Sequence, residues 1–288
     1  MGVGAVRRGT LTYRAAAVLA SLAGLVFLLI VASLVREGLP AITWRFLVGG
    51  ARGGNIGPEL FNTAFMVGAA LLVTVPLGLL AAIFQTEYLH GRGRRVRSAD
   101  RLSATLLSAP TIVIALVVYR VAVGWWHWPV SVLTGVLALT VINWPFMLTI
   151  SKQALHHVPE GYREASLALG ATRMQTALRV VVPAALGELV DGWGLAFARL
   201  AGESAALIVT AGVNVSAHWS ILGPGETLAV HIWYIRTEGV GVSRDAQAAA
   251  TGVALMVLIT VVVWVAGRAA RWAGRPHSAK GGRSEWRR

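Results

Sequence analysis

The stretch VPEGYREASLALGATRMQTALRVVVPAAL (158–186) is a polar segment inside a chain made mostly of long apolar runs. Pro159 stands where a helix can start, and Glu160 and Glu164 fall near that N-terminus, where the helix dipole favours anions. Gly170 can end this first short helix in a left-handed cap, after which a second, amphipathic helix follows. The pattern predicts two short helices on a membrane surface, although taken alone it also suits a simple connector.

The apolar runs on both sides of this segment are long enough to cross a bilayer, which takes roughly 20 residues. The chain of 288 residues is 56% hydrophobic and only 14% charged, whereas soluble domains carry about 25% charged residues. Its mean hydropathy is +0.64. We therefore predict an all-α polytopic membrane protein with six spans, at residues 15–35, 60–86, 102–123, 130–150, 185–211 and 246–267.

Three of these spans contain an internal proline, and the first span could be mistaken for a signal peptide. Pro76, Pro110 and Pro145 fall inside the second, third and fourth spans, where each removes a backbone hydrogen bond and predicts a bend. The first apolar run is longer than a typical signal-peptide core and no A-x-A site closes it. We predict that it is an uncleaved helix.

The basic residues divide unequally between the two sides of the predicted membrane. Loops on one side carry 19 Lys and Arg and loops on the other side carry 5, out of 26 in the chain. The positive-inside rule then places both termini in the cytoplasm. This gives a cytoplasmic N-terminus (1–13), a transmembrane domain (14–267) with a cytoplasmic loop at about 152–182, and a basic tail (268–288). We expect the tail to contact anionic lipid headgroups rather than nucleic acid.

Several kinds of chemistry lack their residues in this sequence. There are no cysteines, so disulfides and thiolate sites are excluded. His127 lies in a tryptophan-rich turn without a second metal ligand at useful spacing, so no metal site is predicted. No paired carboxylates, histidine cluster or serine–histidine arrangement is apparent within the spans, which disfavours an intramembrane enzyme. A G-x4-G-K-[ST] phosphate loop is also missing, so this chain is not a nucleotide-binding subunit.

Two charges stand inside the fifth span, in FARLAGESAALIV (197–209). One Arg or Asp at the centre of a span costs about 2.5–3.5 kcal/mol on insertion scales. Arg199 and Glu203 could form a self-neutralising i,i+4 ion pair that only packs helices. We favour a second interpretation, in which Arg199 binds a passing anion through its guanidinium fork and Glu203 orients Arg199. Glu188 and Asp191 continue the same stripe toward the cytoplasm, where contact with water is the simpler explanation.

The spacing within 158–186 resembles the EAA loop of ABC-transporter permease subunits, E-A-A-x3-G-x9-I-x-L-P. Glu164-Ala165-Ser166 is followed three residues later by Gly170, and Val180-Val181-Val182-Pro183 ends the pattern. The resemblance implies a cytoplasmic coupling helix that docks on a separate ATPase subunit through Glu164, Ala165 and Gly170. ATP and Mg would be bound by that ATPase, and no cofactor by this chain.

Further stretches resemble the PstA-type permease of bacterial phosphate importers. They are GGNIGPELFNTAF (53–65), LLSAPTIVIALVVY (106–119), REASLALGATR (163–173) and ARLAGESAALIVTAG (198–212). Ser204 stands where the family has Thr, and Ala206 where it has Pro, which suggests a straighter fifth helix. The resemblance implies the type I ABC-importer permease fold in a bacterial inner membrane, with a substrate pathway that includes Arg199, Glu203 and Ser204. Arg120 is a further pathway candidate, although it sits near the outer end of its helix, where snorkelling to the interface explains it.

The same resemblance implies the partners of this chain and its lack of enzymatic activity. A second, PstC-type permease subunit would complete a heterodimer, a PstB-type ATPase dimer would supply energy, and a PstS-type binding protein would deliver phosphate. Permeases for sulfate, molybdate or phosphonate are alternatives, distinguished by the anion that the binding protein retains. A proton-coupled carrier that titrates Glu203 is a further alternative, and transport without the ATPase would favour it.

Overall fold

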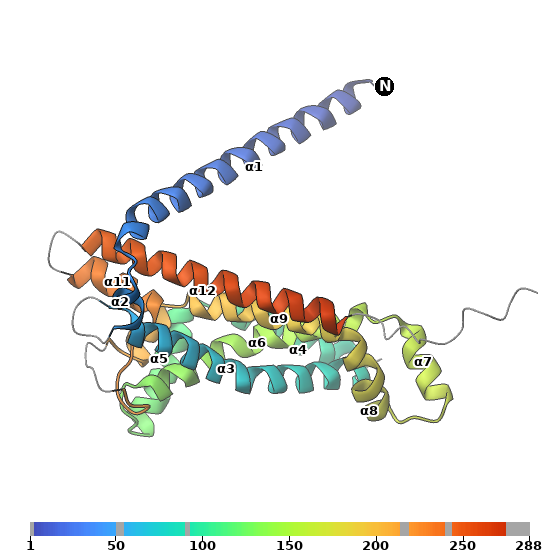
Figure 1. The fold of residues 1–288 in the computed structure, drawn as a ribbon. Helices are drawn as coiled ribbons and strands as arrows, with labels where there is room; N and C mark the ends of the chain where they lie inside the picture. Colours follow the sequence, from blue (N-terminus) through green and yellow to red (C-terminus); the bar gives the residue numbers. More distant parts are fainter. Residues whose placement is uncertain (1–2, 50–54, 90–92, 214–218, 240–243, 275–288) are drawn as a thin grey trace, which may run out of the picture.

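The computed structural model describes residues 3–49, 55–89, 93–213, 219–239 and 244–274, and every regular element in these ranges is helical (Figure 1). In chain order the elements are α1 (Val3–Gly38), the 3-10 turn η1 (Leu39–Ala41), α2 (Trp44–Val48), α3 (Gly57–Ile83), the π-helical turn η2 (Phe84–Tyr88), α4 (Gly93–Ser108), α5 (Thr111–Tyr119), the π-helical turn η3 (Arg120–Trp125), α6 (Val132–His157), α7 (Glu160–Ala168), α8 (Arg173–Thr176), the π-helical turn η4 (Ala177–Val181), α9 (Val182–Ala201), α10 (Ala205–Thr210), α11 (Leu228–Glu238) and α12 (Arg244–Ala273).

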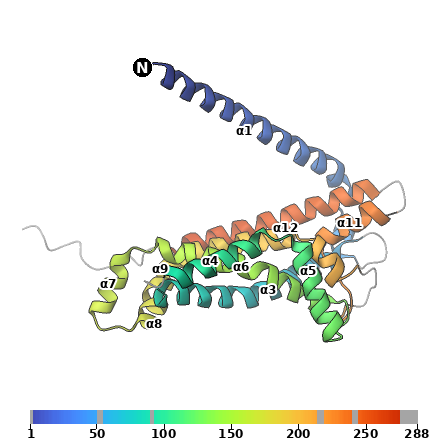
Figure 2. The same cartoon turned by 180° about the vertical axis from the view of Figure 1, so that it is seen from behind.

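The long helices α3, α6, α9 and α12 lie side by side and form the body of the molecule (Figures 1 and 2). Small residues let them approach closely. A Cβ atom on Gly78 would lie 2.7 Å from the Cβ of Met147, and one on Gly194 would lie 2.6 Å from the Cβ of Ala266. Such contacts are typical of helices packed in a membrane, where close van der Waals packing replaces the hydrophobic effect between helices.

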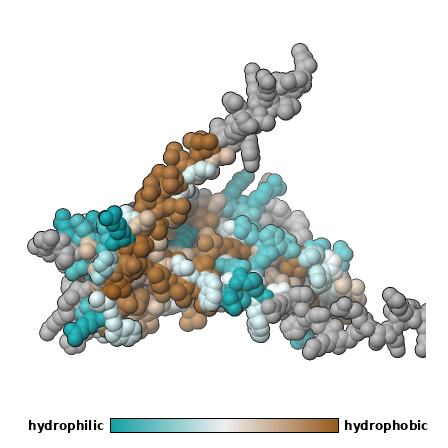
Figure 3. Space-filling model, turned by 45° about the horizontal axis from the view of Figure 1, so that its top comes forward, coloured by the Kyte–Doolittle hydropathy of each residue, from teal (hydrophilic) through white to brown (hydrophobic). Residues whose placement is uncertain are grey.

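Five helical segments are long and apolar enough to cross a membrane, and a bent pair of helices can form a sixth span. The five segments are Ala16–Ala41, Gly57–Tyr88, Val132–His157, Arg173–Ala201 and Arg244–Ala273. The all-α polytopic prediction is therefore confirmed. The space-filling view shows apolar side chains over the bundle and along α1, with polar side chains gathered toward the ends (Figure 3).

The third predicted span is the bent pair, in which Arg97–Ser108 and Thr111–Trp125 meet at 95°. Pro110 lies at this break, so the bend predicted for this proline is confirmed. A proline has no N–H group, and it disfavours the helical conformation of the residue before it. Pro76 and Pro145, in contrast, lie inside the uninterrupted helices α3 and α6.

The bounds predicted for the fifth span, 185–211, are wrong at both ends. Its helical segment begins at Arg173 and ends at Ala201. The start is earlier because Pro183 falls in the first turn of α9, where its missing N–H is tolerated, directly after the wide turn η4. The end is earlier because the chain leaves the helix at Gly202.

The short helices lie at the two ends of the bundle. The short helices α7 and α8 lie at one end, and α2 and α11 lie at the other (Figures 1 and 2). Helix α1 leaves the bundle at an angle and packs against α12, where Gly38 lies against the backbone of Ala249. Its apolar side chains between residues 16 and 30 are exposed on this chain, as expected for a helix that faces lipid or another subunit.

Candidate functional site

The fifth span is broken at the position where sequence analysis expected a continuous helix. Helix α9 ends at Ala201 and α10 begins at Ala205, so Glu203 and Ser204 lie in a non-helical segment. The expectation of a straighter helix, based on Ala206 replacing a proline, is wrong. The turn at Gly202 ends α9 without a proline, and the Glu203 carboxylate stabilises the new helix start by accepting a hydrogen bond from the N–H of Ala206 at 3.3 Å.

This break lies against the break in the third span. The Thr111 hydroxyl at the start of α5 donates a hydrogen bond to Glu203 Oε1 at 3.2 Å. Below this contact α5, α6 and α10 share a small apolar core of Ala115, Ile142 and Ala206. Glu203 thus joins the N-terminal ends of α5 and α10, two half-helices of different spans.

Arg199 lies one turn before the break and does not pair with Glu203. Its guanidinium carbon lies 4.8 Å from the centre of the Phe146 ring, a cation–π contact. No ion pair joins Arg199 to any acidic residue in the part of the chain that the structure describes. The structure therefore shows neither the i,i+4 ion pair nor a contact through which Glu203 could orient Arg199. Helix α9 ends at Ala201, so Glu203 no longer lies one helical turn from Arg199.

The polar stripe predicted on α9 lies on an open face of this chain. Glu188, Asp191 and Leu195 are exposed, and Arg199 is half-buried. Glu188 Oε2 accepts a hydrogen bond from the ring Nδ1–H of His157 at 2.6 Å, on the surface. The stripe is thus largely exposed on this chain, with Asp191 beside Gly267 of α12.

The two remaining pathway candidates lie at different depths. Ser204 is half-buried in the break beside Glu203. Arg120 is exposed at the start of η3, at the far end of α5 from the break. The structure thus brings Arg199, Glu203 and Ser204 to one region and leaves Arg120 outside it, in agreement with snorkelling. None of the four has a tested role, and their place in a pathway stays a prediction.

The loop that carries the EAA-like spacing folds as two short helices, α7 and α8, joined through Gly170. Gly170 has a φ of +85°, the left-handed conformation expected from its spacing, and the space around it is open. Thr172 and Gln175 form a reciprocal capping box at the start of α8. Glu164 and Ala165 are exposed on α7. All three residues predicted to dock an ATPase are therefore accessible.

An apolar hollow lies beside these residues. Its volume is about 550 Å³, and it is lined by Pro159, Gly161, Tyr162, Ala165, Ser166, Leu169 and Val180. Leu169 is 90% exposed and Tyr162 is 56% exposed. Exposed large apolar side chains of this kind are typical of surfaces that contact another protein or the membrane.

The residue that fixes α7 to the bundle was not recognised from the sequence. Arg163 is buried, and its guanidinium bonds the Glu87 carboxylate at 3.1 Å and the carbonyl oxygens of Val158 and Leu155 at 2.9 and 2.7 Å. Arg173 adds a hydrogen bond to the Glu87 carbonyl oxygen at 2.9 Å. Both short helices are thus attached to η2, the end of α3.

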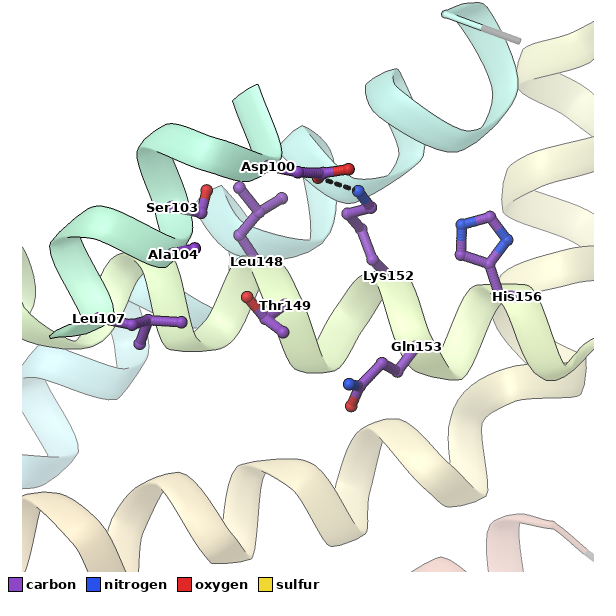
Figure 4. A pocket seen from close by; sticks show the side chains of 9 residues that line it. All are labelled: Asp100, Ser103, Ala104, Leu107, Leu148, Thr149, Lys152, Gln153 and His156. Atoms are coloured by element: carbon purple, nitrogen blue, oxygen red, sulfur yellow. Dashed lines mark hydrogen bonds and ion pairs between the residues drawn. The ribbon is translucent and has the colours of Figure 1, made fainter. Parts of the chain in front are cut away.

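A second cavity of about 360 Å³ lies between α4 and α6 (Figure 4). Lys152 on α6 reaches Asp100 on α4 and forms an ion pair at its rim. Leu107 and Leu148 line its apolar part. Asp100 thus pairs with the lysine, and His156 also lines the cavity.

One group of described residues could hold a metal ion, which sequence analysis did not foresee. Glu59, Glu226 and His231 each offer one ligand atom, and these atoms lie within 4.8 Å of one another. Burial alone would lower the pKa of His231, but its hydrogen bond to Glu226 and the charges of Glu226 and Glu59 raise its pKa above the ordinary value. The three residues come from separate segments without motif spacing, and they lie outside the predicted spans, to which the expectation of no converging carboxylates and histidine applied.

A multi-helix apolar bundle with broken spans, and a loop helix bound to one end of it, places the chain in the class of polytopic membrane proteins. Residues 74–274 match the family described as "Binding-protein-dependent transport system inner membrane component". The chain belongs to this family, and it is a multi-pass inner-membrane protein.

Named relatives support the more specific resemblance. The chain is 34% identical to the "Probable ABC transporter permease protein YqgI" of Bacillus subtilis (strain 168), over 84% of this chain and 86% of that protein. It is 32% identical to the "Phosphate transport system permease protein PstA" of Haemophilus influenzae, over 70% of this chain and 72% of the relative. The prediction of a PstA-type ABC permease is confirmed, and such subunits are transport components rather than enzymes.

Solved structures share the fold. A bacterial alginate ABC transporter in complex with a pentasaccharide-bound periplasmic protein superposes with a TM-score of 0.71, at 15% identity, over 94% of this chain and 98% of the matched chain. The MetNI methionine ABC transporter in an inward-facing conformation gives a TM-score of 0.60, at 21% identity, over 80% and 97% of the two chains. The type I ABC-importer permease fold is thereby confirmed.

Proposed function

We propose that this chain is the transmembrane subunit of an ATP-driven importer of inorganic phosphate and that it forms half of the translocation pathway. Relatives named as phosphate transport permeases support the substrate. The observation that carries the proposal is the unpaired guanidinium of Arg199 beside the two helix breaks.

Arg199 is costly where it stands. It lies in the last turn of α9, at the break within the fifth span; a cation at the centre of a span would cost about 2.5–3.5 kcal/mol, and no ion pair joins Arg199 to a carboxylate in the described part of the chain. Phe146 covers one face of the guanidinium, which leaves the N–H groups at its edge available. A phosphate oxygen pair matches this planar fork and would compensate the charge during passage.

A second permease subunit completes the pathway in this proposal. Arg199 and Glu203 together carry no net charge, whereas phosphate carries one or two negative charges, so one chain alone makes a poor anion site. The open face of α9 with Glu188, Asp191 and Leu195 would be covered by a PstC-type subunit that adds its own positive group.

The coupling loop would dock on a PstB-type ATPase dimer, which holds ATP and Mg. Glu164, Ala165 and Gly170 are exposed around the apolar hollow beside α7, which is the arrangement expected for a protein contact. A PstS-type binding protein would deliver phosphate at the opposite end of the bundle, and both termini of this chain would be cytoplasmic.

The test is uptake of radiolabelled phosphate by cells that express the whole transporter. Arg199→Gln should abolish uptake while the complex still assembles, and Arg199→Lys should not rescue it, because lysine lacks the bidentate fork. Arg120→Gln, which removes an exposed arginine outside the site, is the matched control and should retain uptake.

Three outcomes would contradict the proposal. Substantial uptake by the Arg199→Gln variant would mean that the anion pathway lies elsewhere. Competition by sulfate or molybdate but not by excess phosphate would identify another oxyanion. Uptake that persists without the ATPase subunit would identify a proton-coupled carrier.

A further inference from the structure

A buried cluster of two carboxylates and one imidazole lies at the end of the bundle opposite α7. Glu59 stands in the first turn of α3, Glu226 lies just before α11, and His231 lies in the first turn of α11. The imidazole Nδ1 is 2.8 Å from Glu226 Oε1 and 4.0 Å from Glu59 Oε1. We propose that these three side chains bind a divalent transition-metal ion of the zinc type.

Burial without sufficient partners is the first argument for a bound ion. Glu59 is 3% exposed and Glu226 is 1% exposed. The Oε2 atom of each is fully buried and has no hydrogen-bond partner in the described part of the chain. Two adjacent buried carboxylates repel one another and lose their hydration, so the site requires a positive charge or a proton. A divalent cation neutralises both carboxylates at once.

The backbone around the cluster is held in place, which is the second argument. Thr63 accepts a hydrogen bond from the N–H of Leu228 at 2.8 Å and donates one to the Glu59 carbonyl oxygen at 2.7 Å. The Asn62 side chain donates to the Glu226 carbonyl oxygen at 3.1 Å. All three ligand-bearing segments are therefore joined through the first turns of α3. A metal site needs this kind of outer support to hold its ligands in position.

The Asn62 side chain is itself held by Trp219, whose indole N–H donates to Asn62 Oδ1 at 2.8 Å. The Trp219 ring packs edge-on against Phe61 and Phe65. This aromatic group covers the outer side of the α3 turns that support the ligands.

The donor set selects the class of metal. Carboxylate oxygen and imidazole nitrogen bind zinc and its first-row neighbours at about 2.0–2.2 Å, and three protein ligands leave one open position. Calcium takes about 6–8 oxygen ligands, which this set does not offer, and magnesium keeps several waters. The three ligand atoms lie within 4.8 Å of one another. They can approach a small ion when the His231–Glu226 hydrogen bond is replaced by bonds from both residues to the metal.

A bound ion would fasten α11 and the preceding loop to α3. This inference does not depend on phosphate as the substrate or on Arg199. The exposed pair of His157 and Glu188, with an Nδ1–Oε2 distance of 2.6 Å, has the same chemistry without burial or a third ligand. It therefore provides a matched control within the chain.

The experiment uses the full-length chain purified in detergent with its co-expressed partner subunits, treated with a chelator and then dialysed against zinc chloride. Elemental analysis should find about one zinc per copy of this chain, since the site offers three ligands to one ion. Glu226→Gln and His231→Gln should each weaken zinc binding by about 100-fold or more, because loss of an outer hydrogen-bond partner alone costs roughly 10–100-fold. His157→Gln should bind zinc as the unaltered chain does.

Thermal unfolding gives a second measurement. Zinc should raise the unfolding midpoint of the unaltered chain and of His157→Gln, and should leave that of Glu226→Gln unchanged. An unaltered chain that retains no zinc overturns the proposal, whether or not any variant folds. Zinc loss in His157→Gln equal to that in His231→Gln also overturns it. If the chain retains no metal and Glu59→Gln leaves its stability unchanged, the two carboxylates share a proton in place of the metal, and the proposal is overturned.

Discussion

Replacing Arg163 by methionine should release α7 from the bundle, because this buried arginine makes the contacts that attach the helix. The substitution keeps the unbranched apolar stem but not the guanidinium, and it removes the bonds to the Glu87 carboxylate and to the carbonyl oxygens of Val158 and Leu155. Both charged side chains of the ion pair are 9% exposed. While α7 stays attached to the bundle, water therefore cannot replace the lost contacts.

The size of the effect follows from the charge that is left behind. Breaking a buried ion pair by removing one partner costs about 3–5 kcal/mol, because the remaining charge is uncompensated. The lower value corresponds to a change of about 10²-fold in the equilibrium between attached and released α7. Amide hydrogen exchange of α7 reports local opening of this kind. We expect the exchange of α7 amides to accelerate by about 10²-fold while that of α3 and α6 stays unchanged.

Two further variants separate this mechanism from general damage. Arg163→Met combined with Glu87→Gln removes both charges and should recover part of the lost stability, as replacement of whole buried pairs does. Arg179→Met removes an exposed arginine from the neighbouring turn η4 and should leave α7 exchange unchanged. Equal exchange rates in the Arg163→Met and unaltered chains would refute the attachment role.

Three other predictions concern the loop, the helix break and the topology. Gly170→Ala should destabilise the loop by about 1–2 kcal/mol because of its left-handed backbone, whereas Gly161→Ala, in equally open space but inside α7, should not; chemical unfolding of both variants checks this, and equal effects would contradict it. Glu203→Gln should retain the hydrogen bonds at the break and lower the unfolding free energy by less than about 1.5 kcal/mol. Glu203→Leu should lower the unfolding free energy more, and chemical unfolding in which Glu203→Gln is the less stable variant would refute the bridging role. Single cysteines at Gly93 and Ser216 should be labelled only from the cytoplasm and only from outside, respectively, as the positive-inside rule requires; labelling of both from one side would refute the six-span topology.

The spans and the loop could be predicted because their signals are local. Apolar length defines a span without knowledge of its neighbours, and the bend at Pro110 follows from the missing N–H of proline. The left-handed Gly170 followed from its spacing within the loop. These features depend on residues close in sequence, so one chain was sufficient to identify them.

The break in the fifth span could not be predicted, because its cause is tertiary. Gly202 is tolerated in membrane helices, and Glu203 is an acceptable helix former. Glu203 lies outside the helices, and its carboxylate accepts hydrogen bonds from Thr111 on a different span and from the N–H of Ala206. The sequence does show that each of the two spans is interrupted by residues untypical of an apolar helix, one near Pro110 and one near Gly202. Only the fold shows that these two interruptions lie close together.

Buried charges were the other feature that sequence reasoning misjudged. Glu87 borders a predicted span, Arg163 lies within the cytoplasmic loop, and both appear as ordinary loop charges in the sequence. Glu59 likewise precedes a span, and nothing in its spacing connects it to Glu226. In each case folding brings together residues that no fixed motif relates, so the burial that determines their chemistry is absent from the local pattern.

Helix α3 connects these two buried charge clusters. Its 27 residues span about 40 Å at a rise of 1.5 Å per residue, with Glu59 in the first turn and the Arg163 contacts just beyond the last. Midway, Thr74 accepts a hydrogen bond from the Asn143 side chain of α6 at 3.0 Å. A displacement of α7 must therefore either break the contacts of Arg163 or move the end of α3. Because a helix transmits an axial shift along its length, movement of α3 would also move the turn that carries Glu59. Arg163→Met breaks those contacts and therefore leaves α3 in place, so it should change α7 exchange without changing zinc binding at Glu59.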